Sequence, residues 1–226
     1  MFCHITSWVE DDPHAKLLSE KGGDAFPYIV FMDGDGDVVT QYNSSRSTEG
    51  FRAAAQAVGK YLRLRDSADS PDAAVRVELL MAQLELGVLG HGEARAKAEQ
   101  LEKLENYEEA VTEEARARLK QRLVNLEFQA FLDSLPADKP RSEIVEIAAK
   151  GIFARQDRGE IPDGNDGITF FNIQMMYGEQ TGDAQLVEAA ASKLKKQLDP
   201  QDAMHMRIID QVDRRVAKAK EKAKDK

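Results

Sequence analysis

The sequence predicts an α+β protein that is mostly α-helical and has a small sheet near its N-terminus. Before residue 66, short runs of β-branched and aromatic residues are bounded by Gly, Asp and Pro, which is typical of strands. After that point every periodic segment has the spacing of a helix. The polar stretch Asp66–Pro71 separates the segment with strand-like patterns from the segment with helical patterns. We therefore expect two domains, residues 1–66 and 67–226, the second all-helical with a charged C-terminal tail.

The first domain is expected to hold three strands and two helices. The strands are Phe2–Thr6, Tyr28–Met32 and Val38–Tyr42. A short helix over 13–21 ends at a pair of glycines, and a longer helix over 48–65 follows a capping Ser or Thr. We expect the strands to form a small antiparallel sheet in chain order, with both helices packed against it.

The second domain is expected to be a helical bundle or a set of helical hairpins. Gly and Pro breakers delimit helices over 71–90, 92–105, 107–134, 141–158, 165–181, 183–198 and 200–218. In Leu79–Ala96 and Phe170–Leu198, a helix, a tight Gly-containing turn and a second helix follow one another. This arrangement is similar to tetratricopeptide-type helix pairs, although no period of about 34 residues is visible. The bundle and the hairpins both stay open as interpretations.

The apolar cluster in the expected helix 165–181 also has two interpretations. Phe170, Ile173 and Tyr177 share one helical stripe, which favours packing in the core. Met175 and Met176 lie beside this stripe, and a Met-rich groove that binds peptide is the alternative.

Composition and charge exclude several classes of function. The chain has 226 residues and a formal net charge of −9 at pH 7, which argues against general nucleic-acid binding because phosphates attract basic surfaces. No apolar run approaches the ~20 residues that span a bilayer, so no membrane partner is expected. The N-terminus shows no signal peptide, which favours the cytoplasm. The histidines are dispersed, and we predict no metal, no cofactor and no catalytic residue.

The segment Asp33–Asp37 resembles the start of a calcium-binding loop but lacks its spacing. An EF-hand loop counted from Asp33 requires Gly at the sixth position and Glu at the twelfth. Those positions hold Val38 and Ser44. Because Asp and Gly are also the usual residues of hairpin turns, we expect a tight turn between the second and third strands.

The first domain resembles the second half of a thioredoxin fold. The stretch Leu17–Val39 carries the resemblance: a helix ends in Gly, a short loop leads to Phe26-Pro27, and an apolar strand is followed by an Asp/Gly turn and another strand. Pro27 aligns with the cis-proline of that family, which implies a cis Phe26–Pro27 bond. In that family the backbone beside this proline pairs with an extended substrate chain. The resemblance covers residues 1–66.

The Cys-x-x-Cys motif of the thioredoxin family is absent from the chain. Cys3 is the only cysteine, and it lies on the expected first strand, away from any helix N-terminus that would lower its pKa. Thiol–disulfide exchange within one protein requires an attacking and a resolving thiol. These 226 residues are therefore not expected to act as a dithiol oxidoreductase.

The sequence favours a non-catalytic, thioredoxin-like binding or scaffolding protein. The resemblance implies that Phe26, Pro27 and Tyr28 hold an extended peptide, and Trp8 is a further candidate as an exposed anchor. The expected partner is a protein or peptide, or a second copy of the chain paired through the edge strand Phe2–Thr6. One alternative is the C-terminal portion of a longer thiol–disulfide oxidoreductase whose dithiol motif precedes the first residue. Another is that the helical domain is the functional half.

Overall fold

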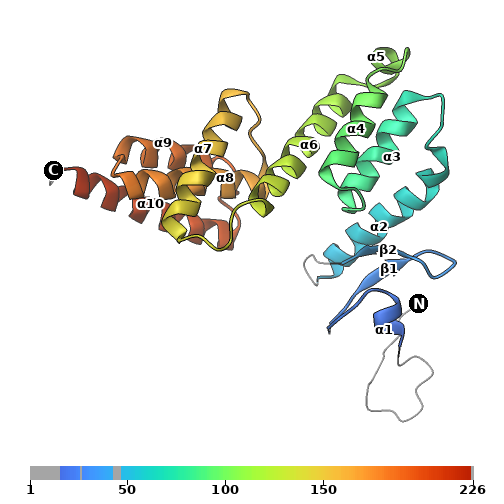
Figure 1. Cartoon of the computed structure of the whole chain (residues 1–226), viewed down its shortest axis with the longest axis horizontal. Coiled ribbons are helices and arrows are strands. Elements are labelled where there is room, and N and C mark those ends of the chain that lie inside the picture. The colour runs from blue at the N-terminus through green and yellow to red at the C-terminus, as the bar shows by residue number, and fades with distance from the viewer. Residues whose placement is uncertain (1–15, 26, 43–46, 225–226) are drawn as a thin grey trace, which may run out of the picture. The chain divides into compact units, whose positions relative to one another are not determined.

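The computed structural model describes residues 16–25, 27–42 and 47–224 of the chain. The chain divides into two compact units, Met1–Arg116 and Ala117–Lys226. The mostly helical α+β content that the sequence predicts is confirmed (Figure 1). The boundary expected near residue 66 lies inside the first unit, and the packing of the first unit explains this difference.

The sheet of the described residues is one antiparallel hairpin. β1 (Val30–Met32) pairs with β2 (Val38–Gln41), with one register irregularity between the strands. The turn expected between these strands is present. The expected strand Phe2–Thr6 lies outside the described residues, so the three-stranded sheet stays a prediction.

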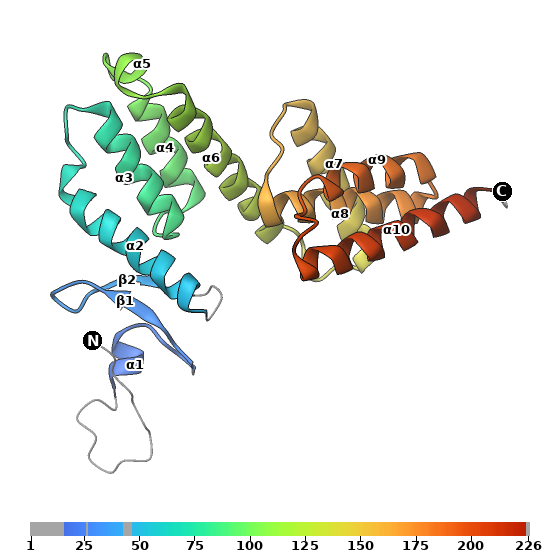
Figure 2. The same ribbon diagram turned by 180° about the vertical axis from the view of Figure 1, so that it is seen from behind.

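Short and long helices complete the first unit. They are α1 (Leu17–Glu20), α2 (Thr48–Leu64), the 3₁₀ turn η1 (Arg65–Ser67), α3 (Ala73–Glu85), α4 (His91–Leu101) and α5 (Tyr107–Ala110). Ser47 caps α2 by accepting a hydrogen bond from the Gly50 N–H at 3.1 Å, and Asp72 caps α3 by accepting one from the Ala74 N–H at 2.8 Å. Figure 2 shows α3 and α4 packed side by side.

Three contacts attach the hairpin to the helices, one of them between Asp33 in the hairpin turn and Arg65 of η1. The ring of Tyr42 stacks on Phe51 of α2, with the ring centroids 4.5 Å apart. The Thr40 hydroxyl on β2 donates a hydrogen bond to the Leu86 carbonyl oxygen at 2.8 Å. Helix α2 in turn packs on α3. Because these contacts join residues on both sides of position 66, the hairpin and the helices that follow form one compact unit.

The helix expected over 107–134 is interrupted, which corrects the prediction from sequence. Val111, directly after α5, is extended with φ −100° and ψ 117°, and its side chain is buried. Helix α6 (Glu113–Asp133) then begins, and the Thr112 hydroxyl accepts a hydrogen bond from the Ala115 N–H at 3.2 Å. An extended residue with a buried side chain, followed by a capping Thr, ends one helix and starts the next.

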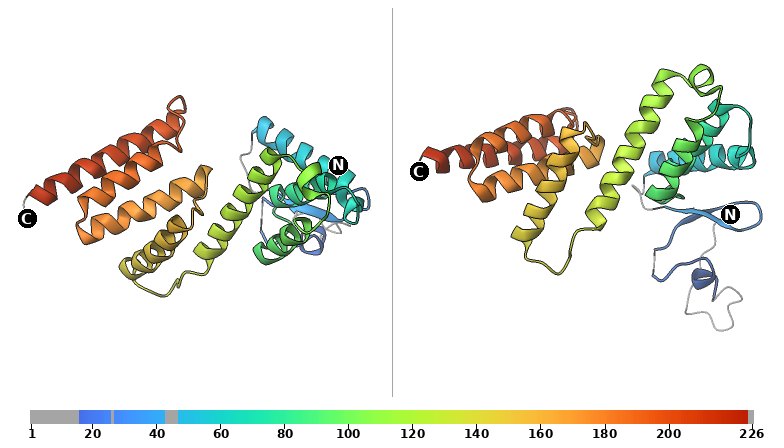
Figure 3. Two further views of the ribbon diagram at one scale, coloured as in Figure 1. Left: turned by 90° about the horizontal axis from the view of Figure 1, so that it is seen from above. Right: turned by 45° about the horizontal axis from the view of Figure 1, so that its top comes forward.

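The second unit contains most of α6 and four further helices. They are α7 (Arg141–Asp157), α8 (Gly164–Thr181), α9 (Ala184–Lys195) and α10 (Ala203–Lys224). Successive helices pack on one another: α7 on α8, α8 on α9, and α9 on α10 (Figure 3). The largest fully buried side chains of their core are Phe128, Ile152, Phe170, Met175, Val187 and Leu194.

The core stripe expected on α8 is confirmed. Phe170 is fully buried, and its ring centroid lies 5.6 Å from that of Phe128 on α6. Ile173 is half-buried against the same core. Tyr177, also half-buried, contacts the edge of Phe153 on α7 with the ring centroids 5.9 Å apart.

Two glycines allow α8 and α9 to form a tight hairpin. Gly182 ends α8 with a positive φ of 76°, a conformation that side chains disfavour. Asp183 then caps α9 by accepting a hydrogen bond from the Leu186 N–H at 2.9 Å. At Gly178 the two helices approach so closely that an added Cβ would lie 2.9 Å from Val187 Cγ2 and 3.0 Å from the Asp183 carbonyl oxygen.

We expect Gly178→Ala to destabilise the protein, although alanine is the better helix former. The new methyl group must push α9 away, and such overpacking costs about 1–3 kcal/mol of unfolding free energy. Gly59→Ala on α2 is the matched control: its Cβ would contact only Arg63 Nη1, at 3.7 Å, so the helix propensity of alanine should add up to about 1 kcal/mol. Urea unfolding followed by circular dichroism measures both changes. A Gly178→Ala variant as stable as the unmodified protein would contradict the close approach.

Candidate functional site

The hairpin turn is organised by the Asp33 carboxylate. Oδ1 accepts hydrogen bonds from the N–H groups of Asp35 and Asp37, both at 3.0 Å. Oδ2 accepts one from Arg65 Nη1 at 2.8 Å. The hydrogen bond from Arg65, and then those from the turn, hold the pKa of Asp33 below its ordinary value of 3.8. This carboxylate is engaged by the turn and by η1, in agreement with the expected hairpin turn.

Two of the four predicted binding residues lie at the entrance to β1. Pro27 is exposed, and the half-buried Tyr28 donates a hydrogen bond from its hydroxyl to the Lys21 carbonyl oxygen at 2.7 Å. Lys21 Nζ in turn donates to the Gly36 carbonyl oxygen at 2.6 Å, which ties this segment to the hairpin turn. The other two predicted residues, Phe26 and Trp8, lie outside the described residues. The geometry of the Phe26–Pro27 bond therefore stays a prediction.

β1 presents a second backbone edge on the side away from β2. The Ile29 carbonyl oxygen accepts a hydrogen bond from the Tyr42 N–H at 2.8 Å, and the Asp33 N–H donates to the Asp37 carbonyl oxygen at 3.0 Å. Because hydrogen-bonding directions alternate along a strand, the N–H and C=O groups of Val30 and Met32 point away from β2. Within the described part of the chain, β1 pairs with no other strand. This edge begins three residues after Pro27.

The second unit contains a polar groove between α7, α8 and α10. It consists of two adjoining hollows of about 530 Å³ and 510 Å³, which share Glu179, Gln180 and Arg215. The remaining lining residues come from the first two turns of α7, from α8 and the glycine that ends it, and from the C-terminal half of α10. They are Arg141, Ser142 and Val145; Asn172, Met176, Gly178 and Gly182; and Lys218, Ala219 and Lys222.

Arg215 is held rigidly in the middle of this groove. Its Nε and Nη2 donate to the two carboxylate oxygens of Glu179 at 2.7 and 3.0 Å, and Nη1 donates to Asn172 Oδ1 at 2.5 Å. The two-point pairing with a carboxylate fixes both the position and the plane of the guanidinium. Gln180 Nε2 donates to the Ser142 carbonyl oxygen at 3.2 Å, which joins α8 to the start of α7.

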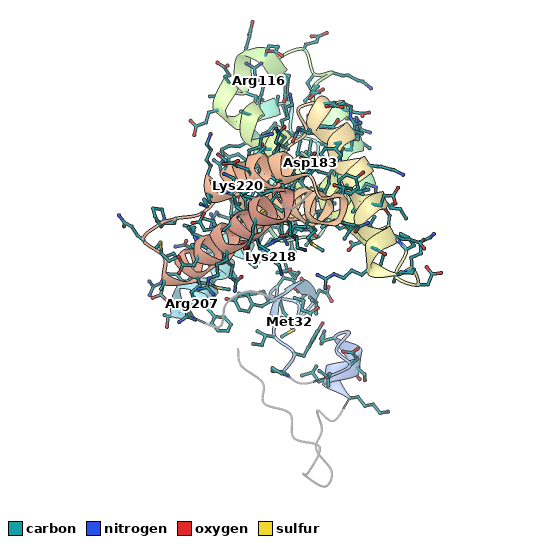
Figure 4. The ribbon with its side chains drawn as sticks, turned by 90° about the vertical axis from the view of Figure 1, so that its left-hand side faces the viewer. Met32, Arg116, Asp183, Arg207, Lys218 and Lys220 are labelled. Carbon is teal, nitrogen blue, oxygen red and sulfur yellow. The ribbon has the colours of Figure 1, made fainter. Side chains whose placement is uncertain are left out.

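The groove carries an excess of positive charge. Its lining contains four cationic side chains, Arg141, Arg215, Lys218 and Lys222, and one anionic side chain, Glu179. Arg215 is neutralised by Glu179, whereas the other three cations form no salt bridge within the described residues. Figure 4 shows Lys218 and Lys220 on opposite sides of α10, and Lys220 turns to Glu188 on α9 instead.

Sequence reasoning named Met176 of this groove but missed its cations, because it treated the lysine-rich C-terminus only as a charged tail. A signal was nevertheless present in the spacing of Arg215, Lys218 and Lys222. Residues separated by three and then four positions lie on one face of a helix. The partners Glu179 and Asn172 are on another helix, so spacing along one segment could not have found them.

Neither a metal centre nor a known family supplies a function for these surfaces. Within the described residues, no group of three or more His, Cys, Asp or Glu side chains is arranged to hold a metal ion. No helix in the same residues has both the length and the apolar character needed to cross a membrane. No protein-family model, curated protein or solved structure matches the chain. The function must therefore be inferred from the contacts and charges of the chain itself.

The Asp33–Arg65 pair predicts how the hairpin responds to acid. A carboxyl whose pKa is lowered by folding stabilises the folded state above its unfolded pKa, and this stabilisation is lost as pH falls through the folded pKa. The hairpin should therefore weaken below pH 3.8, the ordinary pKa of the Asp33 side chain. Arg65→Ala should raise the pKa of Asp33, whereas Arg63→Ala on the neighbouring turn should leave it unchanged. A carboxyl-carbon NMR titration checks this, and an unaltered Asp33 pKa in Arg65→Ala would refute the pairing.

Proposed function

We propose that this protein is a non-catalytic binding module that holds an extended polypeptide along the outer edge of β1. The observation that carries the proposal is the orientation of Val30 and Met32, whose backbone groups point away from the only strand that β1 pairs with in the described residues. Such an edge recognises an extended chain by adding it as another strand, and here the peptide would take the place that the sequence predicts for Phe2–Thr6. The thioredoxin-like character of the unit, inferred from the sequence, belongs to the same proposal.

The surroundings of this edge support the proposal. The side chains of Val30, Phe31 and Met32 are half-buried, so they offer partly accessible apolar surface to an incoming chain. The hydrogen bond from the Tyr28 hydroxyl to Lys21 fixes the segment that leads into β1. The backbone is thus positioned before a peptide arrives, which lowers the entropic cost of binding.

A titration of the ¹⁵N-labelled full chain with the peptide acetyl-Lys-(Thr-Val)₄-Lys-amide tests strand addition. We expect chemical-shift changes centred on residues 28–32 and slower hydrogen exchange at the Val30 and Met32 amides, because each would gain a hydrogen-bond partner. The same peptide with an N-methyl group on every backbone amide cannot donate and should bind at least about tenfold more weakly. Equal binding of the N-methylated peptide, or shifts confined to other elements, would overturn the proposal.

The non-catalytic part of the proposal has a separate test. With Cys3 as their only thiol, these 226 residues lack the resolving cysteine that dithiol exchange needs. In an insulin-reduction assay with dithiothreitol, we expect the rate to equal the background rate, and Cys3→Ser should give the same value. Turnover above background that Cys3→Ser abolishes would show that the chain is catalytic.

A further inference from the structure

We propose that the groove between α7, α8 and α10 binds an acidic segment of a partner protein. This surface lies in the second unit, and the inference is independent of strand addition at β1. Three cationic side chains around the groove, Arg141, Lys218 and Lys222, have no salt-bridge partner within the described residues. A partner with closely spaced Asp or Glu side chains supplies the charges that they lack.

The shape of the groove favours a polypeptide over a small molecule. The two hollows adjoin through Glu179, Gln180 and Arg215 and together extend from the start of α7 to the C-terminal half of α10. Pockets for small molecules are concave and mostly apolar, with few polar groups. Here seven of the thirteen lining residues carry charged or amide side chains, and Met176, Val145 and Ala219 are the main apolar members. An elongated, polar groove suits side chains presented one after another.

One cation of the groove is fixed in position, whereas others can move to meet a ligand. Arg215 cannot reorient without losing its hydrogen bonds to Glu179 and Asn172. Lys218 and Lys222 are exposed, and their flexible stems allow the ammonium groups to follow a carboxylate. Arg141 stands in the first turn of α7, where the positive end of the helix dipole also favours an anion.

The charge of the whole chain decides between two kinds of acidic partner. A nucleic acid presents continuous phosphate charge and would be repelled by a protein whose formal net charge is −9. A short acidic peptide segment needs to match only the groove. The local excess of cations can therefore attract a short acidic segment, while the negative charge of the rest of the protein repels longer polyanions.

Fluorescence anisotropy with fluorescein-labelled decaglutamate tests the proposal on the full chain. We expect saturable binding that weakens as NaCl is raised, because salt screens exposed charges. The double variant Lys218→Gln/Lys222→Gln should bind about tenfold more weakly or worse. The matched control is Arg207→Gln/Lys220→Gln, which removes the same charge from the same helix at two positions that do not line the groove. This control should bind within about twofold of the unmodified protein.

Three results would overturn the proposal. The first is an equal loss of affinity in the two double variants, which would indicate a response to net charge alone. The second is equally tight binding of a labelled (Ser-Gly)₅ peptide, which carries no acidic side chain. The third is tighter binding of the oligonucleotide (dT)₁₀, which would assign the groove to nucleic acid. Thermal melts followed by circular dichroism verify that each variant is folded.

Discussion

The burial of α8 on more than one side is the constraint on which the second unit depends. Phe170 and Met175 are both fully buried although they lie on different faces of the helix. The one buried polar side chain is Gln174, at 2% exposure within the described residues, and its Nε2 donates to Gln156 Oε1 on α7 at 2.9 Å. Lys193 Nζ on α9 donates to the same oxygen at 3.3 Å. An unsatisfied amide in the position of Gln174 would be costly, and the two hydrogen bonds to Gln156 Oε1 join α7, α8 and α9 beside the apolar core.

This constraint also determines where the groove lies. Two faces of α8 are buried in the core. The remaining face is accessible and carries Asn172, Met176 and Glu179, which are spaced four and then three residues apart. Helix α10 contributes Arg215 opposite this face, and its pairing with Glu179 and Asn172 connects the two helices across the groove. The position of the groove thus follows from the packing of the core, and α10 supplies three of its four positively charged side chains.

Much of the helical architecture could be predicted from the sequence because its signals are local. The expected helix over 141–158 matches α7 at Arg141–Asp157, and glycines and prolines mark several other ends correctly. The break at Val111 could not be predicted in this way, because it accompanies the burial of one side chain in the folded unit. The division into compact units falls elsewhere than the domain boundary expected at Asp66–Pro71, since a polar stretch can also be a turn between packed helices.

The two candidate sites also differ in how far the sequence alone can predict them. Pro27 and Tyr28 could be singled out because a short string of residues resembles a known family. The groove depends on side chains from three helices, and its central pair joins residues 36 positions apart. Periodicity within one helix indicates which face is polar, but it does not identify the helix that will lie opposite. The pairing of charged residues on different helices could therefore be identified only from the structure.

The hydrogen bond from Thr40 to Leu86 has a consequence for the order of folding. It joins residues 46 positions apart, and the chain between them must be brought into a closed loop before the bond can form. In the second unit, by contrast, the most extensive helix packing joins neighbours along the chain: α7 with α8, α8 with α9, and α9 with α10. Contacts between neighbours in sequence form faster than contacts that close long loops. The hairpin should accordingly dock late, after α2 and α3 have assembled, and a nascent chain would expose its strand edges until then.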